Sequence, residues 1–461
     1  MRLKKHITDL DVENAIVSAE LIGAPDFINE DGKVEVYALA TYLIEKRNAQ
    51  TIRGTKREIF IYESGIYIEG EDKLKKDIRT LLKSACTNYH IREVVEMIKD
   101  RTSIDREAFA TDINLINLNN GVLDISTHEF TPHDSRHLFF TKIPVDFDAN
   151  ADCPTIKKYL SDVLDPAQIL VIQEWFGYAL YREYFIKKAL ICVGEGDTGK
   201  TTLINLLFEF IGAKNISGVS LQKITYDKFA AAHLYNKSLN LYDDLSFKDI
   251  QDNGAFKIAT GGGVITGEKK FKDQFLFKNY AKLTFACNKI PDVKDASDDA
   301  YFNRWMVIHF DHVIEEENKD RQLIHKMTTT GELSGLLNFA LDGLKRLRIM
   351  QRFSYDRETH EIKTEMMRSA SSIACFAGDR MEEVTGEWIS KEDLYHAYTE
   401  YASIHKQPAV SMKTFGGRLA MHAPYVAEYK PIDPNDPKGK KQITAWRNVK
   451  LKVEDLALST S

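Results

Sequence analysis

A glycine-rich segment that ends in a lysine and a threonine is the part of the sequence best suited to chemistry. Residues 194–201 read Gly-Glu-Gly-Asp-Thr-Gly-Lys-Thr and follow an apolar run at 189–193. In such a segment backbone N–H groups surround phosphate oxygens, Lys200 reaches the β and γ phosphates, and the Thr201 hydroxyl binds Mg²⁺. The pattern predicts binding of ATP and Mg²⁺ by Gly194, Glu195, Gly196, Asp197, Thr198, Gly199, Lys200, Thr201 and Thr202.

Two adjacent acids follow a second apolar segment, at residues 238–242. A nucleotide hydrolase needs one acid for Mg²⁺ and a neighbouring group that orients water. The sequence therefore predicts Asp243 as a metal ligand beside Thr201, and Asp244 as the residue that orients water. The alternative is a solvated turn, which is common for paired acids.

Two further polar residues stand at the ends of predicted strands. Asn288 follows the apolar run 282–287 and could hydrogen-bond both the γ phosphate and the attacking water. Arg304 directly precedes the apolar run 305–310 and could act as an arginine finger for the ATP of a neighbouring subunit. The alternatives are a turn asparagine and an arginine in a salt bridge at a sheet edge.

A basic cluster lies between the acid pair and Asn288. Residues 260–275 read as a hairpin, and its tip carries Lys269, Lys270, Phe271 and Lys272. Lysines neutralise phosphates and an aromatic ring stacks on bases, so this tip is suited to single-stranded DNA. The alternative is a solvated basic turn.

The elements that position these residues alternate between strand and helix from about 189 to 310, which is typical of a parallel-sheet nucleotide-binding domain. Upstream, the pattern predicts helices over 34–47 and 72–85, a hairpin over 59–68, and a helical region over 155–184 in which Trp175 and Phe176 are buried. Downstream, two helices with Ser390 and Ser411 as caps precede a basic turn and a strand over 446–451, an arrangement that resembles a winged helix.

Composition limits the class of protein. The 461 residues are 43% hydrophobic and 28% charged, with a net charge of −6. No apolar run approaches the ~20 residues that span a bilayer, and no apolar signal core follows the basic start, so we expect a cytoplasmic protein without a membrane partner. The net charge excludes a generally basic coat for nucleic acid, so any DNA contact must be local. The five cysteines lack the spacing of a zinc site or a disulfide framework.

The order of these motifs along the chain resembles that of superfamily III helicases, and most closely that of the phage, plasmid and poxvirus-type primase-helicases. The motifs are the glycine segment, the acid pair, Thr260-Gly261-Gly262 with its lysine hairpin, Asn288-Lys289-Ile290-Pro291 and Arg304. The resemblance covers most of residues 106–461. It implies a homohexameric ring with ATP between subunits and hairpins that pull one DNA strand with 3′ to 5′ polarity. The chain departs from the family in having Asp243-Asp244 where Glu is frequent and no second arginine beside Arg304. It also has too few upstream residues for a primase domain.

The predicted fold class is α/β, with a P-loop AAA+-like ATPase core, an N-terminal α+β and helical collar region and a C-terminal winged helix. Expected domains are an accessory domain at 1–105, a collar at 106–184, the ATPase at 185–350, and linker helices with the winged helix at 351–461. The predicted function is an ATP-dependent replicative DNA helicase of a mobile genetic element, acting on single-stranded and forked DNA with a separate primase or polymerase. The alternative is an ATP-controlled origin-binding initiator or scaffold. A small-molecule kinase is disfavoured, because that function would account for neither the lysine hairpin nor the winged-helix pattern of the C-terminal region.

Overall fold

The computed structural model divides the chain into two compact units. The first consists of Met1–Ala151 and Leu333–Leu337, and the second of Asp152–Glu332 and Asn338–Ser461. The structure describes residues 21, 23–109, 112–246, 253–268, 274–291, 298–405, 409–434, 436 and 440–452. The domain boundaries expected at 105, 184 and 350 stay predictions.

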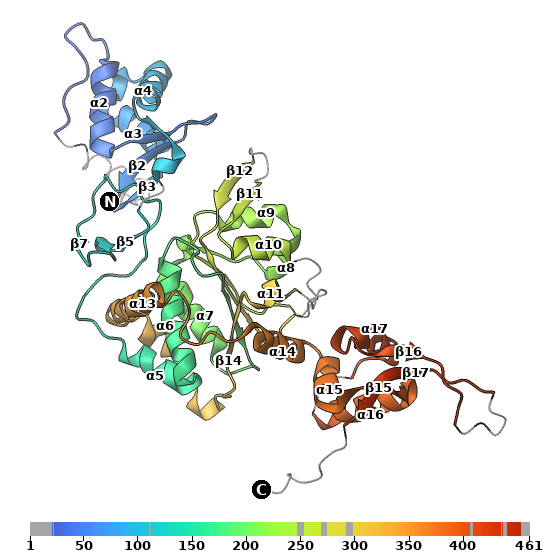
Figure 1. Cartoon of the computed structure of the whole chain (residues 1–461). Helices are drawn as coiled ribbons and strands as arrows, with labels where there is room; N and C mark the ends of the chain where they lie inside the picture. Colours follow the sequence, from blue (N-terminus) through green and yellow to red (C-terminus); the bar gives the residue numbers. More distant parts are fainter. Residues whose placement is uncertain are drawn as a thin grey trace, which may run out of the picture. The chain divides into compact units, whose positions relative to one another are not determined.

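The first unit packs helices against a small sheet (Figure 1). Its helices are α2 (Val36–Arg47), α3 (Glu71–Leu82) and α4 (Asn88–Arg101), and its strands, in the order β3-β2-β1-β4, are β1 (Gln50–Ile52), β2 (Ile59–Glu63), β3 (Ile66–Glu69) and β4 (Ser103–Ile104). The helices predicted over 34–47 and 72–85 and the hairpin over 59–68 are confirmed within a few residues. A buried ion pair with 2.8 Å between Arg47 Nε and Asp77 Oδ2 joins α2 to α3.

A second, antiparallel sheet completes this unit. It consists of β5 (Leu115–Asn117), β6 (Val122–Asp124) and β7 (Phe130–Thr131). The turn between β5 and β6 contains Asn119, whose side-chain amide donates to Asp146 Oδ1 at 2.8 Å.

The second unit is built on a five-stranded sheet in the order β14-β8-β13-β10-β9, and all of its pairings are parallel. Its strands are β8 (Ala189–Val193), β9 (Ile216–Ser217), β10 (Leu239–Tyr242), β13 (Lys282–Cys287) and β14 (Trp305–His309). Every residue of β8 and β13 is buried. Central parallel strands are covered on both faces, which explains their nearly continuous apolar sequences.

Helices surround this sheet. They are α5 (Pro154–Val163), α6 (Pro166–Leu180), α7 (Lys200–Ile211), α8 (Leu221–Tyr226), α9 (Lys228–Ala231), α10 (Gly254–Ala259), α11 (Asp299–Phe302), α12 (Leu323–Met327), α13 (Thr330–Met350) and α14 (Thr359–Ala370). The predicted burial of Trp175 and Phe176 in α6 is confirmed, because both are fully buried. Trp175 reaches the sheet as well as other helices, since its Nε1 donates to Thr284 Oγ1 of β13 at 2.9 Å.

A hairpin of β11 (Val264–Gly267) and β12 (Phe275–Lys278) stands beside α9 and α10 in Figure 1. Its base is fixed by buried polar side chains. The Thr260 hydroxyl donates to the Phe256 carbonyl at 2.8 Å, and the Asn279 amide donates to the Ala259 carbonyl at 2.8 Å. These bonds anchor both ends of the hairpin to α10.

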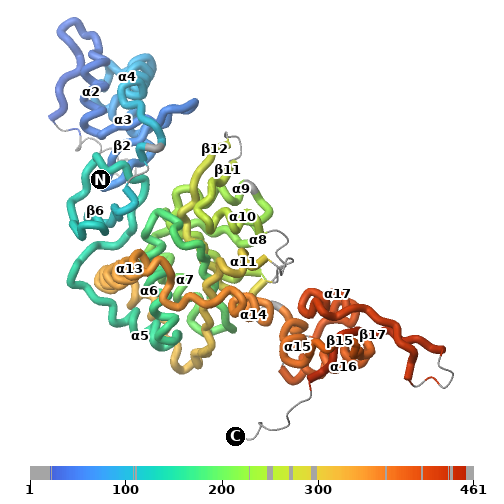
Figure 2. Tube along the Cα trace, viewed as in Figure 1, coloured from blue at the N-terminus to red at the C-terminus, as the bar shows by residue number. Residues whose placement is uncertain are grey.

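The C-terminal part of the second unit has its own core. It contains α15 (Ser372–Arg380), β15 (Met381–Ser390), α16 (Lys391–Ile404), α17 (Met412–His422), β16 (Ala427–Tyr429) and β17 (Ala445–Leu451), with the strands in the order β15-β17-β16. Ser390 and Ser411 accept backbone N–H bonds at the starts of α16 and α17, as the sequence predicted. Between β16 and β17, the described residues Ile432 and Gln442 pair in an isolated antiparallel bridge, and Figure 2 shows this part of the chain extending away from the core.

Candidate functional site

The glycine-rich segment forms a loop between β8 and α7, which we call the glycine loop (residues 194–200). Two of its residues have left-handed backbone, with φ of 62° at Asp197 and 94° at Gly199. A side chain at position 194 would clash, because its Cβ would stand 2.4 Å from the Phe310 carbonyl oxygen. At Gly196 the Cβ position instead faces open space. The glycine loop therefore packs closely against the chain at Gly194 and leaves free space beside Gly196.

Lys200, the first residue of α7, turns its ammonium into the glycine loop. Its Nζ donates to the Glu195 carbonyl and to Thr198 Oγ1, the latter at 3.2 Å. The side chain is almost completely buried. Burial lowers the pKa of Lys200, and the negative charge of Asp243 opposes that shift. A cation thus lies at the N-terminal end of α7, where the helix dipole also favours anions.

The acid pair lies at the carboxyl end of β10, next to Thr201. The Thr201 hydroxyl donates to Asp243 Oδ2 at 3.3 Å, and the Asp244 backbone N–H donates to Asp243 Oδ1 at 2.9 Å. Asp244 has a φ of 57°, so the chain turns sharply after Asp243. The two acids therefore differ in position: Asp243 adjoins the start of α7, and Asp244 stands beyond the turn.

One cavity of about 1130 Å³ joins these groups. The sequence-predicted residues 196–202, Asp243, Asp244 and Asn288 all line it. Parallel strands bring them together, because β8, β10 and β13 end at the same edge of the sheet. The cavity also contains Cys287, whose thiol pKa burial raises to about 12. That thiol stays protonated at neutral pH and is not a nucleophile.

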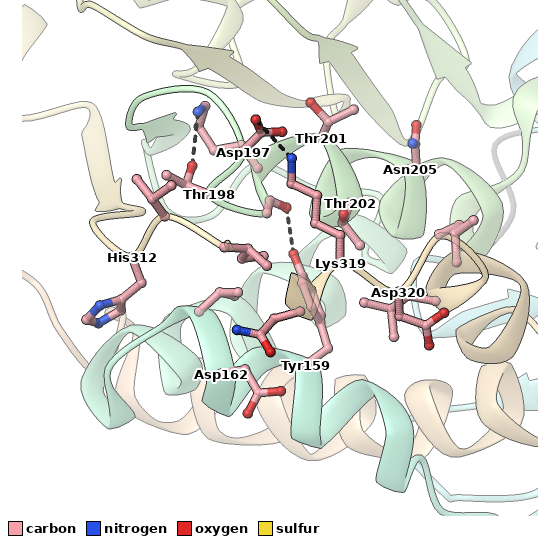
Figure 3. Close-up of a pocket in the computed structure, with 18 of the residues that line it drawn as sticks. Tyr159, Asp162, Asp197, Thr198, Thr201, Thr202, Asn205, His312, Lys319 and Asp320 are labelled. Atoms are coloured by element: carbon pink, nitrogen blue, oxygen red, sulfur yellow. Dashed lines mark hydrogen bonds and ion pairs between the residues drawn. The ribbon is translucent and has the colours of Figure 1, made fainter. Parts of the chain in front are cut away.

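Two walls of the cavity were not predicted. One is α5, from which the Tyr159 hydroxyl donates to the Gly199 carbonyl at 2.8 Å (Figure 3). The other is the segment that follows β14, residues 311–327, which we call the strap. Its Ile314 N–H donates to the Asp197 carbonyl at 2.9 Å. Neither wall carries a recognisable motif, and no local sequence signal would have found them.

Arg304 lies away from this cavity, at the start of β14. Trp305 pairs with Ala189, the first residue of β8, so Arg304 is at the opposite edge of the sheet from the glycine loop. Its guanidinium donates to the Ala300 carbonyl, and burial lowers its pKa. The structure therefore does not bring Arg304 to the cavity of its own chain. Lys269, Lys270, Phe271 and Lys272 lie outside the described residues, although the strands that flank them are in place.

Comparisons with known families and proteins point to viral helicases. A family of unknown function, DUF5906, matches residues 192–304, and the family "D5 N terminal like" matches residues 26–165. "Putative helicase V13" of Sputnik virophage is 24% identical over 416 residues, which are 81% of this chain and 50% of that protein. "Putative helicase 184R" of Invertebrate iridescent virus 6 is 26% identical over 272 residues, 54% of this chain and 27% of that protein.

The chain thus spans about half the length of the first of these relatives and about a quarter of the second. Among solved structures, the C-terminal region of NrS-1 aligns over 88% of this chain and 97% of its own length, at 14% identity and a TM-score of 0.48. By sequence, the chain is similar to the two viral proteins that carry the name "Putative helicase". Within the described ranges, no helix is both long and apolar enough to cross a membrane.

Proposed function

We propose that this chain is an ATP-dependent replicative DNA helicase of a phage, plasmid or other mobile genetic element. One observation carries the proposal: residues 196–200 of the glycine loop, Asp243, Asp244 and Asn288 meet in a single cavity at the carboxyl edge of a parallel sheet. The similarity to viral proteins named as helicases supports the same class of activity.

The phosphates of ATP would lie in the glycine loop. Lys200, Thr201 and Thr202, at the N-terminal end of α7, line this part of the cavity, where backbone N–H groups, the ammonium and the hydroxyls would hold phosphate oxygens. The open space at Gly196 suits close approach of a phosphate to the backbone. This is the arrangement that we expect of a P-loop.

The residues present also fit Mg²⁺, which prefers oxygen ligands. The Thr201 hydroxyl and the Asp243 carboxylate are 3.3 Å apart and both line the cavity. Such an ion, when bound, neutralises charge on the β and γ phosphates. Asp244 and Asn288, on the adjacent ends of β10 and β13, would then orient the attacking water.

Assembly would complete the site. Because Arg304 lies at the far edge of its own sheet, it could act as an arginine finger only on the ATP of another subunit. That geometry supports a superfamily III, AAA+-like homohexameric ring. In it the Lys269–Lys272 tips would line the channel and draw single-stranded DNA with 3′ to 5′ polarity, and a separate primase or polymerase would supply primers.

The test is strand separation by the purified chain. We expect unwinding of a forked duplex that carries a 3′ single-stranded tail, only when ATP and Mg²⁺ are both present. A duplex with only a 5′ tail should remain paired. ATP hydrolysis and DNA binding without any strand separation would contradict the helicase proposal.

A second candidate is an ATP-controlled origin-binding initiator. It is favoured by the C-terminal part of the second unit, where α16 and α17 stand with the β15-β17-β16 sheet, a set of elements that would suit the winged helix expected from the sequence. Such a fold suits duplex DNA, where α17 would enter a groove. In an initiator, nucleotide would control assembly without processive unwinding.

Neutralising the hairpin separates the two candidates. Replacing Lys269 and Lys270 by alanine should abolish unwinding and leave ATP affinity unchanged, because phosphate contacts to the translocated strand are lost. Replacing Lys278, an exposed lysine at the base of the same hairpin, serves as the control and should leave unwinding intact. Binding to duplex origin DNA, measured in parallel, should change little. Normal unwinding by the double variant would refute the role of the tip.

A further inference from the structure

The strap closes one side of the cavity and is tied to the glycine loop at a single residue. After β14 the chain passes along the loop, where the Ile314 N–H donates to the Asp197 carbonyl, and continues through a short 3₁₀ turn (Glu316–Asn318) to α12. Asp197 is the loop residue with a φ of 62°. The strap therefore holds the most strained non-glycine residue of the loop from outside.

Lys319 makes a second connection between the same two segments. Its Nζ lies 3.2 Å from Asp197 Oδ2 (Figure 3), and it also lies 2.6 Å from Glu316 Oε2. Hydrogen bonds to Glu316 and then to Asp197 raise the pKa of the Lys319 ammonium, so it is charged at neutral pH. The side chain of Lys319 is 29% exposed and that of Asp197 is 65% exposed.

These contacts place a lysine on each side of the glycine loop. Lys200 reaches the loop from α7 and is buried, whereas Lys319 reaches it from the strap and remains accessible. Exposed ion pairs are weak, because solvent screens them. Phosphate oxygens carry more charge and accept charge-assisted hydrogen bonds, so a nucleotide in the loop would compete well for the Lys319 ammonium.

We propose that Lys319 is a phosphate-binding residue contributed by the strap, and that it exchanges Asp197 and Glu316 for the phosphates of a bound nucleotide. The inference rests on the proposed function, since it requires that the glycine loop binds a nucleoside triphosphate. Unlike Arg304, Lys319 acts on the cavity of its own chain. Through Lys319 the strap, including its helix α12, responds to whether the glycine loop is occupied.

The experiment is a double-mutant cycle read out by equilibrium binding of ATP, measured by calorimetric titration. Lys319→Met should weaken ATP binding about tenfold, the loss expected for one charge-assisted bond. Glu316→Gln should strengthen ATP binding a few-fold, because it removes a carboxylate that competes with the phosphates for Lys319. Glu316 itself is not part of the glycine loop. In the Lys319→Met background, Glu316→Gln should have no comparable effect. A gain of affinity that depends on Lys319 cannot arise from misfolding.

Lys75→Met is the matched control. Lys75 is 32% exposed and pairs with Glu71 at 2.6 Å in α3, in the first unit, so its loss should leave ATP affinity unchanged. Unaltered ATP affinity in Lys319→Met would overturn the inference, as would an equal effect of Glu316→Gln in both backgrounds. Failure of the unaltered chain to bind ATP would instead contradict the proposed function itself.

Discussion

Replacing Lys200 by alanine is expected to lower the rate of ATP hydrolysis by about 10³-fold or more and to abolish unwinding. The Lys200 ammonium is buried at the N-terminal end of α7, and its only described partners are Glu195 and Thr198 of the same loop. The glycine loop contains no other lysine or arginine, and Lys319 approaches it from the strap and not from the buried end of α7, so it does not take the position of the Lys200 ammonium.

The control for this change is Lys187→Ala. Lys187 is exposed and lies two residues before β8, at the opposite end of that strand from the glycine loop. The Lys187→Ala variant should hydrolyse ATP at the full rate. The measurement is steady-state phosphate release together with separation of a forked duplex. Unwinding that persists in Lys200→Ala would show that the glycine loop is not needed for unwinding.

Asp243→Asn and Asp244→Asn are expected to slow hydrolysis for different reasons. Each should lower the rate by about 10²-fold or more, the size typical of lost electrostatic stabilisation at a reacting centre. Because Asp243 adjoins the Thr201 hydroxyl, its variant should also need more Mg²⁺ to bind ATP. Asp244 lies beyond the turn, so its variant should bind ATP and Mg²⁺ normally and fail only in turnover.

The measurement is therefore ATP affinity as a function of Mg²⁺ concentration, alongside the hydrolysis rate. Glu209→Gln, on the exposed side of α7, removes one carboxylate from the same region and should alter neither quantity. The opposite pattern, with Mg²⁺ dependence altered by Asp244→Asn alone, would exchange the two assignments. The sequence assigned Asp243 to the metal and Asp244 to water, and the turn at Asp244 gives the two acids different positions from which these assignments can be tested.

Much of the candidate site was predictable because parallel strands obey a simple rule. Apolar runs at 189–193, 238–242 and 282–287 each end in polar residues, and strands of one parallel sheet end at a common edge. The sequence placed Asp243, Asp244 and Asn288 at the ends of predicted strands of one parallel sheet, and in the structure they line one cavity with residues 196–200 of the glycine loop. The role of each residue remains a prediction.

The two cavity walls were not predictable, for a physical reason. Tyr159 and Gly199 are 40 residues apart in the sequence, and Asp197 and Lys319 are more than a hundred apart. A local sequence pattern therefore cannot predict either contact. The strap itself has only a 3₁₀ turn and the short α12. In the C-terminal part, β15 was missed because its charged sequence lies at an edge and is mostly exposed, which hides the alternation of a half-buried strand.

Strand β13 holds the cavity and the base of the β11–β12 hairpin at a fixed separation within the second unit. It pairs with β8 on one side and β10 on the other, and every one of its residues is buried. Asn288 follows its last residue at the cavity, while Asn279, at the base of the β11–β12 hairpin, stands three residues before its first. A strand held on both sides neither stretches nor shears. The cavity and the base of the hairpin thus lie at the two ends of one rigid strand, so a change at the cavity would reach the hairpin by movement of β13 as a unit and not by its extension.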